Sequence, residues 1–403
     1  MEHKKIILVS KDAMGKFYLP TYGNKYWKTP NIDELAAKGT VFNRHYASSP
    51  SSAMSWFGMF TGLYAMETKI QTYRRLSEDE IFRGETLFHK AEKLGYECHI
   101  IWDKSLVKSA KSYTECYSED TVFHLLDNIK QPTGVHAVTG KKIVANPQVE
   151  KETCEKLENC IKEIAILPQN TFTWIHLPHV FNGRTGYGTD IDLFDWFIGM
   201  VREHYDDDCI FITADHGNMN GAHGKLAYGF DVYEQATAIP LITPRLENSE
   251  VIDYPTCNID LYNIIFEREI PKREFVYVDS AYYAQLHRKL AIVHNNYKFI
   301  YSNEGKKKEL YDVVFDPYET RNLLEKDLYD VDRGIFSHVE EMYFYPEWDN
   351  VDAETELLEK EWQRVWKKMS PKQYCRAVYE KIGKRVKRKL LYKKRMREKL
   401  QGR

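Results

Sequence analysis

The segment "DCIFITADHGNMNGAHG", residues 208–224, places an acidic residue and a histidine directly after a short apolar run. The run from Ile210 to Ala214 is typical of a buried strand, and Asp215 and His216 follow it at once. A carboxylate and an imidazole are common ligands of divalent cations, and His223 stands in the same glycine-rich loop. The alternative is that Asp215 only caps a following helix. The segment therefore predicts either a metal-binding turn or a helix cap.

Two other apolar runs also end near acidic or imidazole side chains. The run in "KIILVSKD", residues 5–12, ends at Asp12, and the run in "NTFTWIHLPH", residues 170–179, carries His176 and His179. Helix-like segments separate the runs. Strands that alternate with helices predict an α/β fold with a mostly parallel central sheet and helices on both faces. Because ligands bind beyond the carboxyl ends of such strands, we expect these side chains to meet at one edge.

The composition is typical of a globular protein. The chain has 403 residues, of which 43% are hydrophobic, and its 57 basic and 59 acidic residues nearly balance. The seven cysteines are scattered without a paired metal-binding spacing, which is typical of a reducing compartment. The N-terminal sequence lacks the long apolar region of a signal peptide, and no apolar run reaches the roughly 18 residues of a membrane span. We therefore predict a cytoplasmic protein.

The chain divides by composition into three parts. Residues 1–270 carry the alternating strand and helix pattern and form the larger predicted domain. Residues 271–325 contain short, partly alternating runs such as "KLAIVHNNYKFIYS", which are typical of a small antiparallel β subdomain. Residues 326–403 begin as an acidic and aromatic segment and end as a basic tail, in which residues 381–403 hold twelve Lys or Arg and one Glu.

The basic tail has two interpretations. In "KIGKRVKRKLLYKKRMREKL", the apolar residues Ile382, Val386 and Leu390 recur at four-residue spacing among basic residues. This spacing predicts an amphipathic helix that binds an anionic membrane surface, which for a cytoplasmic protein is the inner face of the membrane. The alternative is a helix that is only solvated. Nucleic acid is not an expected partner, because the chain shows no base-reading motif.

The serine-rich segment "YASSPSSAMSWFGMFTG", residues 46–62, leads straight into a predicted buried helix. One interpretation is that its serines cap the helix, because their hydroxyl oxygens can satisfy the free N–H groups of the first turn. The other is that the helix N-terminus holds an anion and activates a hydroxyl against it. The segment alone leaves both interpretations open.

Six stretches, in order, resemble the alkaline phosphatase/sulfatase superfamily, and specifically its sulfatase-like branch. Together they spread over most of residues 4–325. The stretches are "KIILVSKDAMGKFYL", "TPNIDELAAKGTVFNRHYA", "SAMSWFGMFTGLY", "CIFITADHGNMNGAHG", "YEQATAIPLI" and "YKFIYSNEGKKKELYDVVFDPYETRNL". The resemblance implies that residues 1–270 form a sulfatase-like catalytic domain and that residues 271–325 complete its fold.

The resemblance also implies roles for particular residues. The family pattern places the nucleophile nine positions before the Thr of Thr-Gly, which is Ser52 in this chain. The ligands of one divalent metal ion (Mn, Zn, Mg or Ca) would be Asp12, Ser52, Asp215 and His216. His179 and His223 are the expected catalytic histidines, which contact the transferred group or protonate the leaving oxygen. His176 and Arg184 are expected to bind substrate, with Arg184 able to grip an oxyanion. For Arg184, a surface position in a turn-rich connection is an equal alternative.

Four positions depart from the sulfatase pattern. A sulfatase needs Pro and Arg after its nucleophile for oxidation to formylglycine, but Met54 and Trp56 stand there. Lys11 replaces the second acid of the first motif, and Tyr228 stands where Lys or His often follows the second metal motif. Formylglycine is therefore not expected. An unmodified serine with a single metal ion resembles the phosphoglycerol and phosphoethanolamine transferase branch.

These residues predict a metal-dependent, sulfatase-like hydrolase or transferase that acts on phosphoesters through a serine nucleophile. Its substrate would be a small molecule or a glycan, including a lipid-linked precursor of an envelope polysaccharide. One alternative is a sulfuric ester hydrolase. The other is a catalytically degenerate protein that binds anionic glycans or scaffolds a membrane assembly. The four departures from the sulfatase pattern are the evidence for this alternative.

Overall fold

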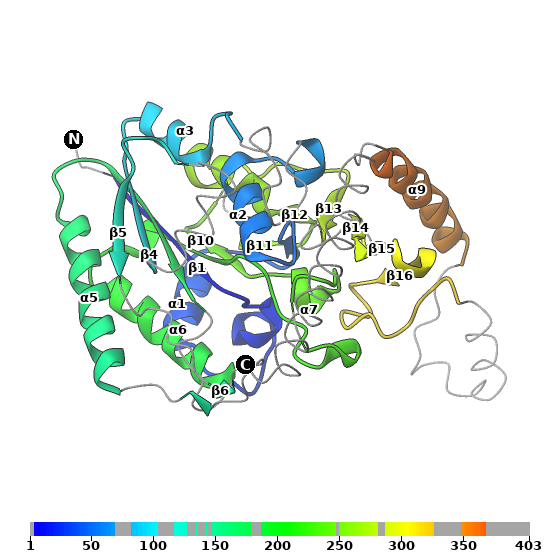
Figure 1. The fold of residues 1–403 in the computed structure, drawn as a ribbon, viewed down its shortest axis with the longest axis horizontal. Helices are drawn as coiled ribbons and strands as arrows, with labels where there is room; N and C mark the ends of the chain where they lie inside the picture. The colour runs from blue at the N-terminus through cyan, green and yellow to red at the C-terminus, as the bar shows by residue number, and fades with distance from the viewer. Residues whose placement is uncertain are drawn as a thin grey trace, which may run out of the picture.

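The computed structural model describes residues 4–68, 82–103, 117–126, 134–135, 142–143, 147–178, 187–226, 228–246, 250–280, 287–325 and 348–367 (Figure 1). No helix within these ranges is long and apolar enough to cross a membrane. His179, Arg184 and the basic tail 381–403, all singled out by the sequence, lie outside the described residues.

An eight-stranded sheet forms the centre of the molecule. Its strands, in spatial order, are β11 (Val251–Ile252), β2 (Thr40–Phe42), β10 (Leu241–Thr243), β9 (Ile210–Ala214), β1 (Lys5–Lys11), β8 (Thr171–Leu177), β4 (Glu97–Asp103) and β5 (Val122–Leu126). The run from β9 to β5 is parallel throughout, and β10 pairs antiparallel with both β9 and β2. The predicted mostly parallel central sheet is therefore confirmed.

Helices cover both faces of this sheet, as the sequence predicts. Ile7 and Val9 of β1 point to one face, where α1 (Pro30–Lys38), α5 (Pro147–Ala165) and α6 (Tyr187–Arg202) supply the core. Leu8 points to the other face, where α2 (Ser52–Thr61), α3 (Leu87–Lys93) and the π-helical turn Asn263–Glu267 pack. Alternate residues of β1 are thus buried on opposite faces, which explains why its sequence is a continuous apolar run.

A second, antiparallel sheet lies beside the central one (Figure 1). Its strands, in order, are β13 (Val276–Asp279), β14 (Lys289–His294), β15 (Tyr297–Ser302) and β16 (Lys307–Asp312). Helix α9 (Trp348–Trp366), from the acidic and aromatic segment, packs on this sheet through Trp362 and Trp366, whose rings lie 4.3 and 4.8 Å from that of Tyr301. The predicted small antiparallel sheet is confirmed, while the division of the chain at residues 270 and 325 stays a prediction.

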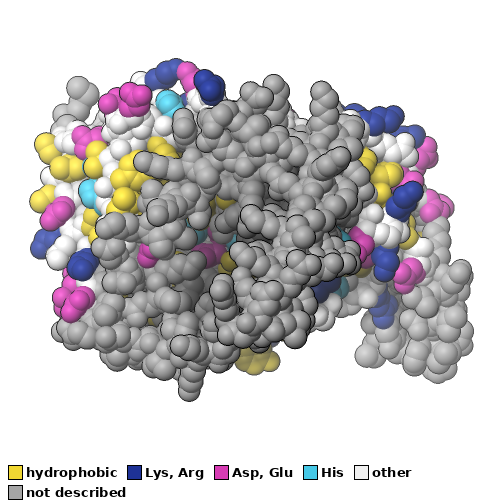
Figure 2. All heavy atoms as spheres, in the orientation of Figure 1, with side chains coloured by type: hydrophobic (Ala, Val, Ile, Leu, Met, Phe, Trp, Pro, Cys, Tyr) yellow, Lys and Arg dark blue, Asp and Glu magenta, His cyan; other side chains and the backbone are white. Residues whose placement is uncertain are grey.

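The remaining elements are short. Strand β3 (His45–Tyr46) pairs with β12 (Thr256–Cys257), and β6 (Gly134–Val135) pairs with β7 (Lys142–Ile143). Helix α7 (Glu234–Thr237) lies between β9 and β10 in the chain order and contacts the loop after β9, where Gly217 N donates to Ala236 O at 2.9 Å. On the face seen in Figure 2, the described acidic and basic side chains are mixed at both ends of the molecule.

A buried ionic cluster joins α7 to the antiparallel sheet. Lys298 Nζ lies 3.0 Å from a carboxylate oxygen of Glu234 and 3.1 Å from one of Glu319, and all three side chains are almost completely buried. The backbone N–H of Glu234 also donates to Glu319. Two carboxyl groups here share one lysine. Burial accordingly raises the pKa of Glu319 to about 8, although Lys298 opposes the shift.

This cluster predicts a pH dependence of stability. A carboxyl group with a raised pKa binds its proton more tightly in the folded state, so its stabilising contribution is complete below its usual pKa near 4.5 and is lost as the pH rises through about 8. We therefore expect the free energy of unfolding to fall over this window, by up to about 1.4 kcal/mol per pH unit for one proton. Urea titrations at several pH values measure this slope. Glu319→Gln, which stays neutral, should flatten it, and an unchanged slope in the variant would contradict the assignment.

Candidate active site

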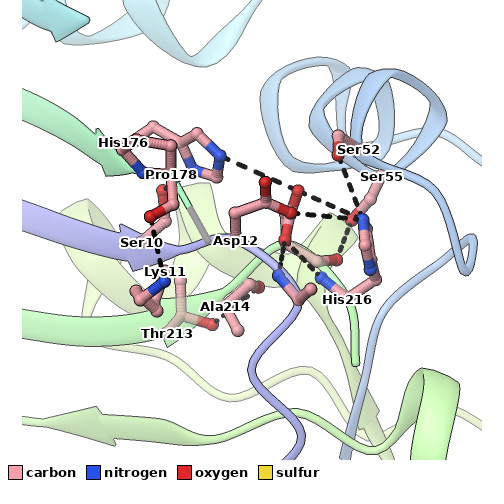
Figure 3. Close-up of polar contacts among 12 residues, drawn as sticks. Ser10, Lys11, Asp12, Ser52, Ser55, His176, Pro178, Thr213, Ala214 and His216 are labelled. Atoms are coloured by element: carbon pink, nitrogen blue, oxygen red, sulfur yellow. Dashed lines mark hydrogen bonds and ion pairs between the residues drawn. The ribbon is translucent and has the colours of Figure 1, made fainter. Parts of the chain in front are cut away.

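Asp12, Asp215 and His216 meet at the carboxyl end of the central sheet. Because β1 and β9 are parallel neighbours, with Lys11 paired to Ala214, the residues that follow the two strands lie side by side. One ligand atom from each of the three side chains lies within 4.8 Å of the other two. Figure 3 shows Asp12 and His216 directed toward each other beside Ser52 at the start of α2. The sequence singles out Asp12, Asp215 and His216, along with Ser52, as metal ligands. The structure brings the first three together.

One oxygen of Asp215 is held by the backbone, and the other points into the cluster. Oδ1 accepts hydrogen bonds from the backbone N–H groups of Ala13, at 3.0 Å, and His216, at 2.8 Å. Oδ2 is buried, accepts no hydrogen bond from any described residue, and lies 3.5 Å from His216 Nε2. A buried carboxylate oxygen without a donor is unfavourable unless a cation compensates it. The residues present therefore fit the divalent cation that the sequence predicts.

His216 directs an unprotonated nitrogen toward the cluster. Its Nδ1 lies 2.7 Å from the carbonyl oxygen of Gly217, so Nδ1 carries the proton and donates it there. Nε2 then offers a lone pair and lies 3.0 Å from Ser52 Oγ and 3.7 Å from Asp12 Oδ1. A neutral imidazole in this position can bind a cation or accept the hydroxyl proton of Ser52.

Ser52 is the first residue of α2. Ser51 before it is extended (φ −141°, ψ 140°), so the helix begins at Ser52 and its hydroxyl lies at the end where backbone N–H groups are free. Ser51 makes no side-chain capping hydrogen bond. The partial positive charge of a helix N-terminus favours an anion nearby. Ser51 therefore does not serve as the capping serine, and the Ser52 hydroxyl lies at the helix end that favours an anion.

A second hydroxyl on α2, Ser55, anchors the helix to the cluster. Ser55 Oγ donates to the backbone carbonyl of Asp215 and accepts from Asn258 Nδ2 at 2.7 Å. The helix also packs closely against Ser48, because a Cβ at Gly58 would lie 2.2 Å from Ser48 Oγ. The sequence motifs single out neither Ser55 as an anchor nor Asn258. The three-residue spacing between Ser52 and Ser55, which puts both on one helix face, was the available signal for Ser55.

His176 is more deeply buried than a substrate contact needs to be. It lies on β8 with 1% of its surface exposed, and its Nε2 is 3.9 Å from Asp215 Oδ2. Its ring meets the ring of Trp56 edge-on at 4.8 Å and stacks on that of Trp174 at 5.7 Å. Burial lowers the pKa of His176, although Asp215 and Asp12 oppose the shift.

The departures from the sulfatase pattern have clear structural positions. Trp56, where an arginine is expected, is 5% exposed and lies among the rings of Trp102, Trp174 and His176 at 4.8–6.0 Å. The ammonium group of Lys11 donates to the carbonyl of Pro178 at 3.1 Å, as Figure 3 also shows. Tyr228 lies against the metal cluster, with its ring 4.5 Å from that of His216. Trp56 and Tyr228 thus place aromatic rings at positions where the sulfatase pattern has basic side chains.

The aromatic surroundings predict that an arginine at position 56 does not restore a sulfatase site. We expect Trp56→Arg to lower the free energy of unfolding by about 3 kcal/mol or more, because it buries a cation among aromatic rings and leaves a cavity. Trp56→Phe is the matched control and should cost less, since Trp56 Nε1 has no hydrogen-bond partner among the described residues. Chemical denaturation measures both. A Trp56→Arg variant as stable as Trp56→Phe would contradict this account of the aromatic packing around position 56.

His223 lies apart from the cluster, in contacts with other residues. Its Nε2 is 3.2 Å from the carbonyl oxygen of Tyr318, and its ring stacks on that of Tyr233 at 3.8 Å. Burial lowers its pKa. No hydrogen bond or ring contact between described residues joins His223 to Ser52 or His216. Of the other residues expected to contact substrate or the transferred group, His179 and Arg184 lie outside the described residues.

Comparisons with known proteins agree with this fold. Residues 4–179 match the family model Sulfatase. The chain is 23% identical over 417 residues to the uncharacterized sulfatase YidJ of Escherichia coli (strain K12), covering 81% of this chain and 84% of that protein.

Two solved structures share the fold. A phosphonate monoester hydrolase of Agrobacterium radiobacter matches with a TM-score of 0.60 and 15% identity, covering 84% of this chain and 95% of that one. BT4656, solved in complex with its substrate D-glucosamine-2-N,6-O-disulfate, matches with a TM-score of 0.56 and 16% identity, covering 84% and 96%. The chain thus resembles the sulfatase family over residues 4–179 and shares the fold of these hydrolases.

Proposed function

We propose that this chain is a metal-dependent enzyme that cleaves or transfers phosphoesters through the unmodified hydroxyl of Ser52. The observation that carries the proposal is the position of Ser52 Oγ, at the N-terminus of α2 and 3.0 Å from His216 Nε2, beside the Asp12, Asp215 and His216 cluster. A divalent ion held by Asp12, Asp215, His216 and Ser52 would neutralise charge on the substrate oxygens and lower the pKa of the hydroxyl.

The protein's own groups supply the remaining steps. Ser52 Oγ attacks the phosphorus, and the free N–H groups at the start of α2 stabilise the negative oxygens. The leaving oxygen needs a proton. His223 already directs Nε2 to the carbonyl of Tyr318, so we assign this proton to His179. Arg184 remains the proposed oxyanion contact. Water, or a glycan hydroxyl in a transfer reaction, then displaces Ser52 from phosphorus.

Phosphoesters are favoured over sulfate esters by the surroundings of Ser52. Met54 and Trp56 stand where Pro and Arg would direct formylglycine formation, and the buried Trp56 brings no positive charge to the site. The sulfatase alternative is supported by the sulfated-sugar substrate of BT4656 and by the family model. A glycan as the substrate class is consistent with either chemistry.

A panel of chromogenic esters tests the proposal. We expect the purified chain to hydrolyse p-nitrophenyl phosphate, bis-p-nitrophenyl phosphate or p-nitrophenyl phenylphosphonate with a kcat/KM at least about a hundredfold above that for p-nitrophenyl sulfate. A preference for the sulfate ester, together with a mass deficit at Ser52, would establish the sulfatase alternative instead. Binding of sulfated glycans with no turnover of any ester would support the degenerate binding protein.

We also propose that residues 381–403 attach the protein to an anionic membrane at its cytoplasmic face. The proposal rests on the basic amphipathic sequence. A chain ending at residue 380 should lose co-sedimentation with phosphatidylglycerol vesicles and keep its turnover of soluble esters. Equal vesicle binding by the full and the shortened chain would remove this part of the proposal, and with it the reason to prefer a lipid-linked substrate.

A further inference from the structure

His176 has one nitrogen with a hydrogen-bond partner and one without. Its Nδ1 lies 2.9 Å from Ser10 Oγ, whereas Nε2 is buried and has no hydrogen-bond partner among the described residues. Nε2 lies 3.9 Å from Asp215 Oδ2, which is too long for a hydrogen bond. Two buried polar atoms, one on each residue, therefore face each other with neither satisfied.

The hydrogen bonds of Ser10 define the tautomer of His176. Trp174 Nε1, which can only donate, lies 2.9 Å from Ser10 Oγ. The carbonyl oxygen of Ile175, which can only accept, lies 3.2 Å from the same hydroxyl. The single hydroxyl proton of Ser10 therefore goes to Ile175, and Ser10 Oγ accepts from both Trp174 and His176 Nδ1. All three contacts are then satisfied, and His176 Nε2 is left with a bare lone pair aimed at the cluster.

The alternative tautomer satisfies fewer groups. If the Ser10 hydroxyl donated to His176 Nδ1, the carbonyl of Ile175 would lose its donor from Ser10, and Nε2 would carry a buried N–H without an acceptor in range. Nε2 lacks a hydrogen-bond partner in either tautomer, so the lost bond to Ile175 decides between them. The bare lone pair at Nε2 is therefore the stable arrangement, and it is the form in which an imidazole binds a metal ion.

Three donor atoms already lie near the spacing of one common ion. Asp215 Oδ2 lies 3.5 Å from His216 Nε2, and His216 Nε2 lies 3.7 Å from Asp12 Oδ1. These distances are close to the roughly 3.3 Å between neighbouring ligand atoms around an ion with bonds of about 2.0–2.1 Å. His176 Nε2 lies 3.9 Å from Asp215 Oδ2 but stands outside the set of three side chains whose ligand atoms all lie within 4.8 Å of one another. The His176 ring must therefore move toward Asp12 and His216 to share their ion.

We propose that His176 is a further side-chain ligand of the metal ion, beside Asp12, Ser52, Asp215 and His216, with Ser10 as the residue that orients it. Lys11 stands where the family pattern has a second acid, and its ammonium group is directed to the carbonyl of Pro178. His176 then supplies the ligand that this acid would have supplied. The centre has two imidazoles, two carboxylates and the Ser52 hydroxyl, a donor set that suits Zn²⁺ or Mn²⁺ and disfavours Ca²⁺, which prefers oxygen ligands alone. This inference rests on the proposed metal site and assigns His176 to the metal rather than to the substrate.

Counting the coordinated imidazoles tests this proposal directly. The wild-type chain loaded with Mn²⁺ or Cu²⁺ should give the ¹⁴N electron spin-echo modulation of two coordinated imidazoles. In His176→Asn this should fall to one, and the dissociation constant for Zn²⁺, measured by chelator competition, should rise by at least about a hundredfold. Ser10→Ala, which removes only the orienting hydroxyl, should raise it by about ten- to a hundredfold.

The matched control is His45, a fully buried imidazole that contacts the hydroxyl of Thr256 at 2.9 Å and lies outside the cluster. His45→Asn should change neither the imidazole count nor the metal affinity. A wild-type count of one imidazole, with stoichiometric metal, would overturn the role of His176 and leave the proposed function standing. A wild-type chain that binds no divalent ion would instead overturn the proposed function. The wild-type count needs no variant and so does not depend on His176→Asn folding.

Discussion

Ser52→Ala is expected to lower kcat for phosphoester cleavage by about a thousandfold or more, because it removes the proposed nucleophile and no neighbouring group replaces it. The fold should be unchanged, since the Ser52 side chain is part-buried and its hydrogen bond is to His216 Nε2. Steady-state kinetics with the best ester of the panel and circular dichroism measure the two effects.

The neighbouring serine provides the control. Ser51 Oγ contacts Ser49 Oγ at 3.2 Å, and Ser51→Ala should change kcat by no more than a few fold. Equal losses in the two variants would show that the segment is sensitive to any substitution. A Ser52→Ala enzyme with near wild-type turnover would show that the nucleophile is another group or water.

Asp215→Asn is expected to separate metal binding from folding. The amide oxygen can still accept the backbone N–H groups of Ala13 and His216, which now bond to Oδ1, but the negative charge that faces the cluster is lost. We expect at least a hundredfold weaker binding of Zn²⁺ or Mn²⁺ and a matching loss of turnover. Isothermal titration calorimetry and metal analysis measure the affinity.

The order of stability of wild type and Asp215→Asn should reverse when the metal is removed. In the wild-type chain, Asp215 Oδ2 is a buried acceptor without a donor among the described residues, which costs about 1–3 kcal/mol. Metal-free Asp215→Asn should therefore be as stable as the metal-free wild type or more so, while added metal stabilises only the wild type. Asp195→Asn, which instead weakens the carboxylate contacts to Asn31 and Ile32, should lose stability and keep its metal. A metal-free Asp215→Asn that is clearly less stable would contradict this account of the cluster.

Much of the fold could be predicted because the physical signals are local. Apolar runs separated by helical segments predict a parallel sheet, and acidic and imidazole groups directly after the runs mark its functional edge. Asp12, Asp215 and His216 meet for this reason. The resemblance to the superfamily added Ser52, which no spacing argument from this chain alone selects.

The orientation of side chains in the site could not be predicted. A strand alternates its side chains, but the sequence does not say that His176 faces the metal cluster or that Ser10 orders its protons, since those contacts join residues 166 positions apart. The resemblance indicates only that position 56 lacks the positive charge of the sulfatase pattern. The structure adds that Trp56 packs among Trp102, Trp174 and His176, a contact that no single segment encodes.

The packing of the C-terminal region was likewise hidden from the sequence. The acidic and aromatic segment shows charge and tryptophans, yet its partner is the antiparallel sheet, reached through Trp362 and Trp366 of α9. The ionic cluster of Lys298, Glu234 and Glu319 is also long-range. Composition showed that these charges exist, but only tertiary packing buries them together.

The central claim is that unmodified Ser52 takes the transferred phosphoryl group, and acid-quench trapping tests it most directly. The enzyme is mixed with a ³²P-labelled phosphoester, quenched within the first turnover and digested for peptide mapping by mass spectrometry. The account predicts label in the peptide that contains Ser52, located on that serine and absent from Ser52→Ala. Turnover with no label on Ser52, or a formylglycine found at that position, would contradict it.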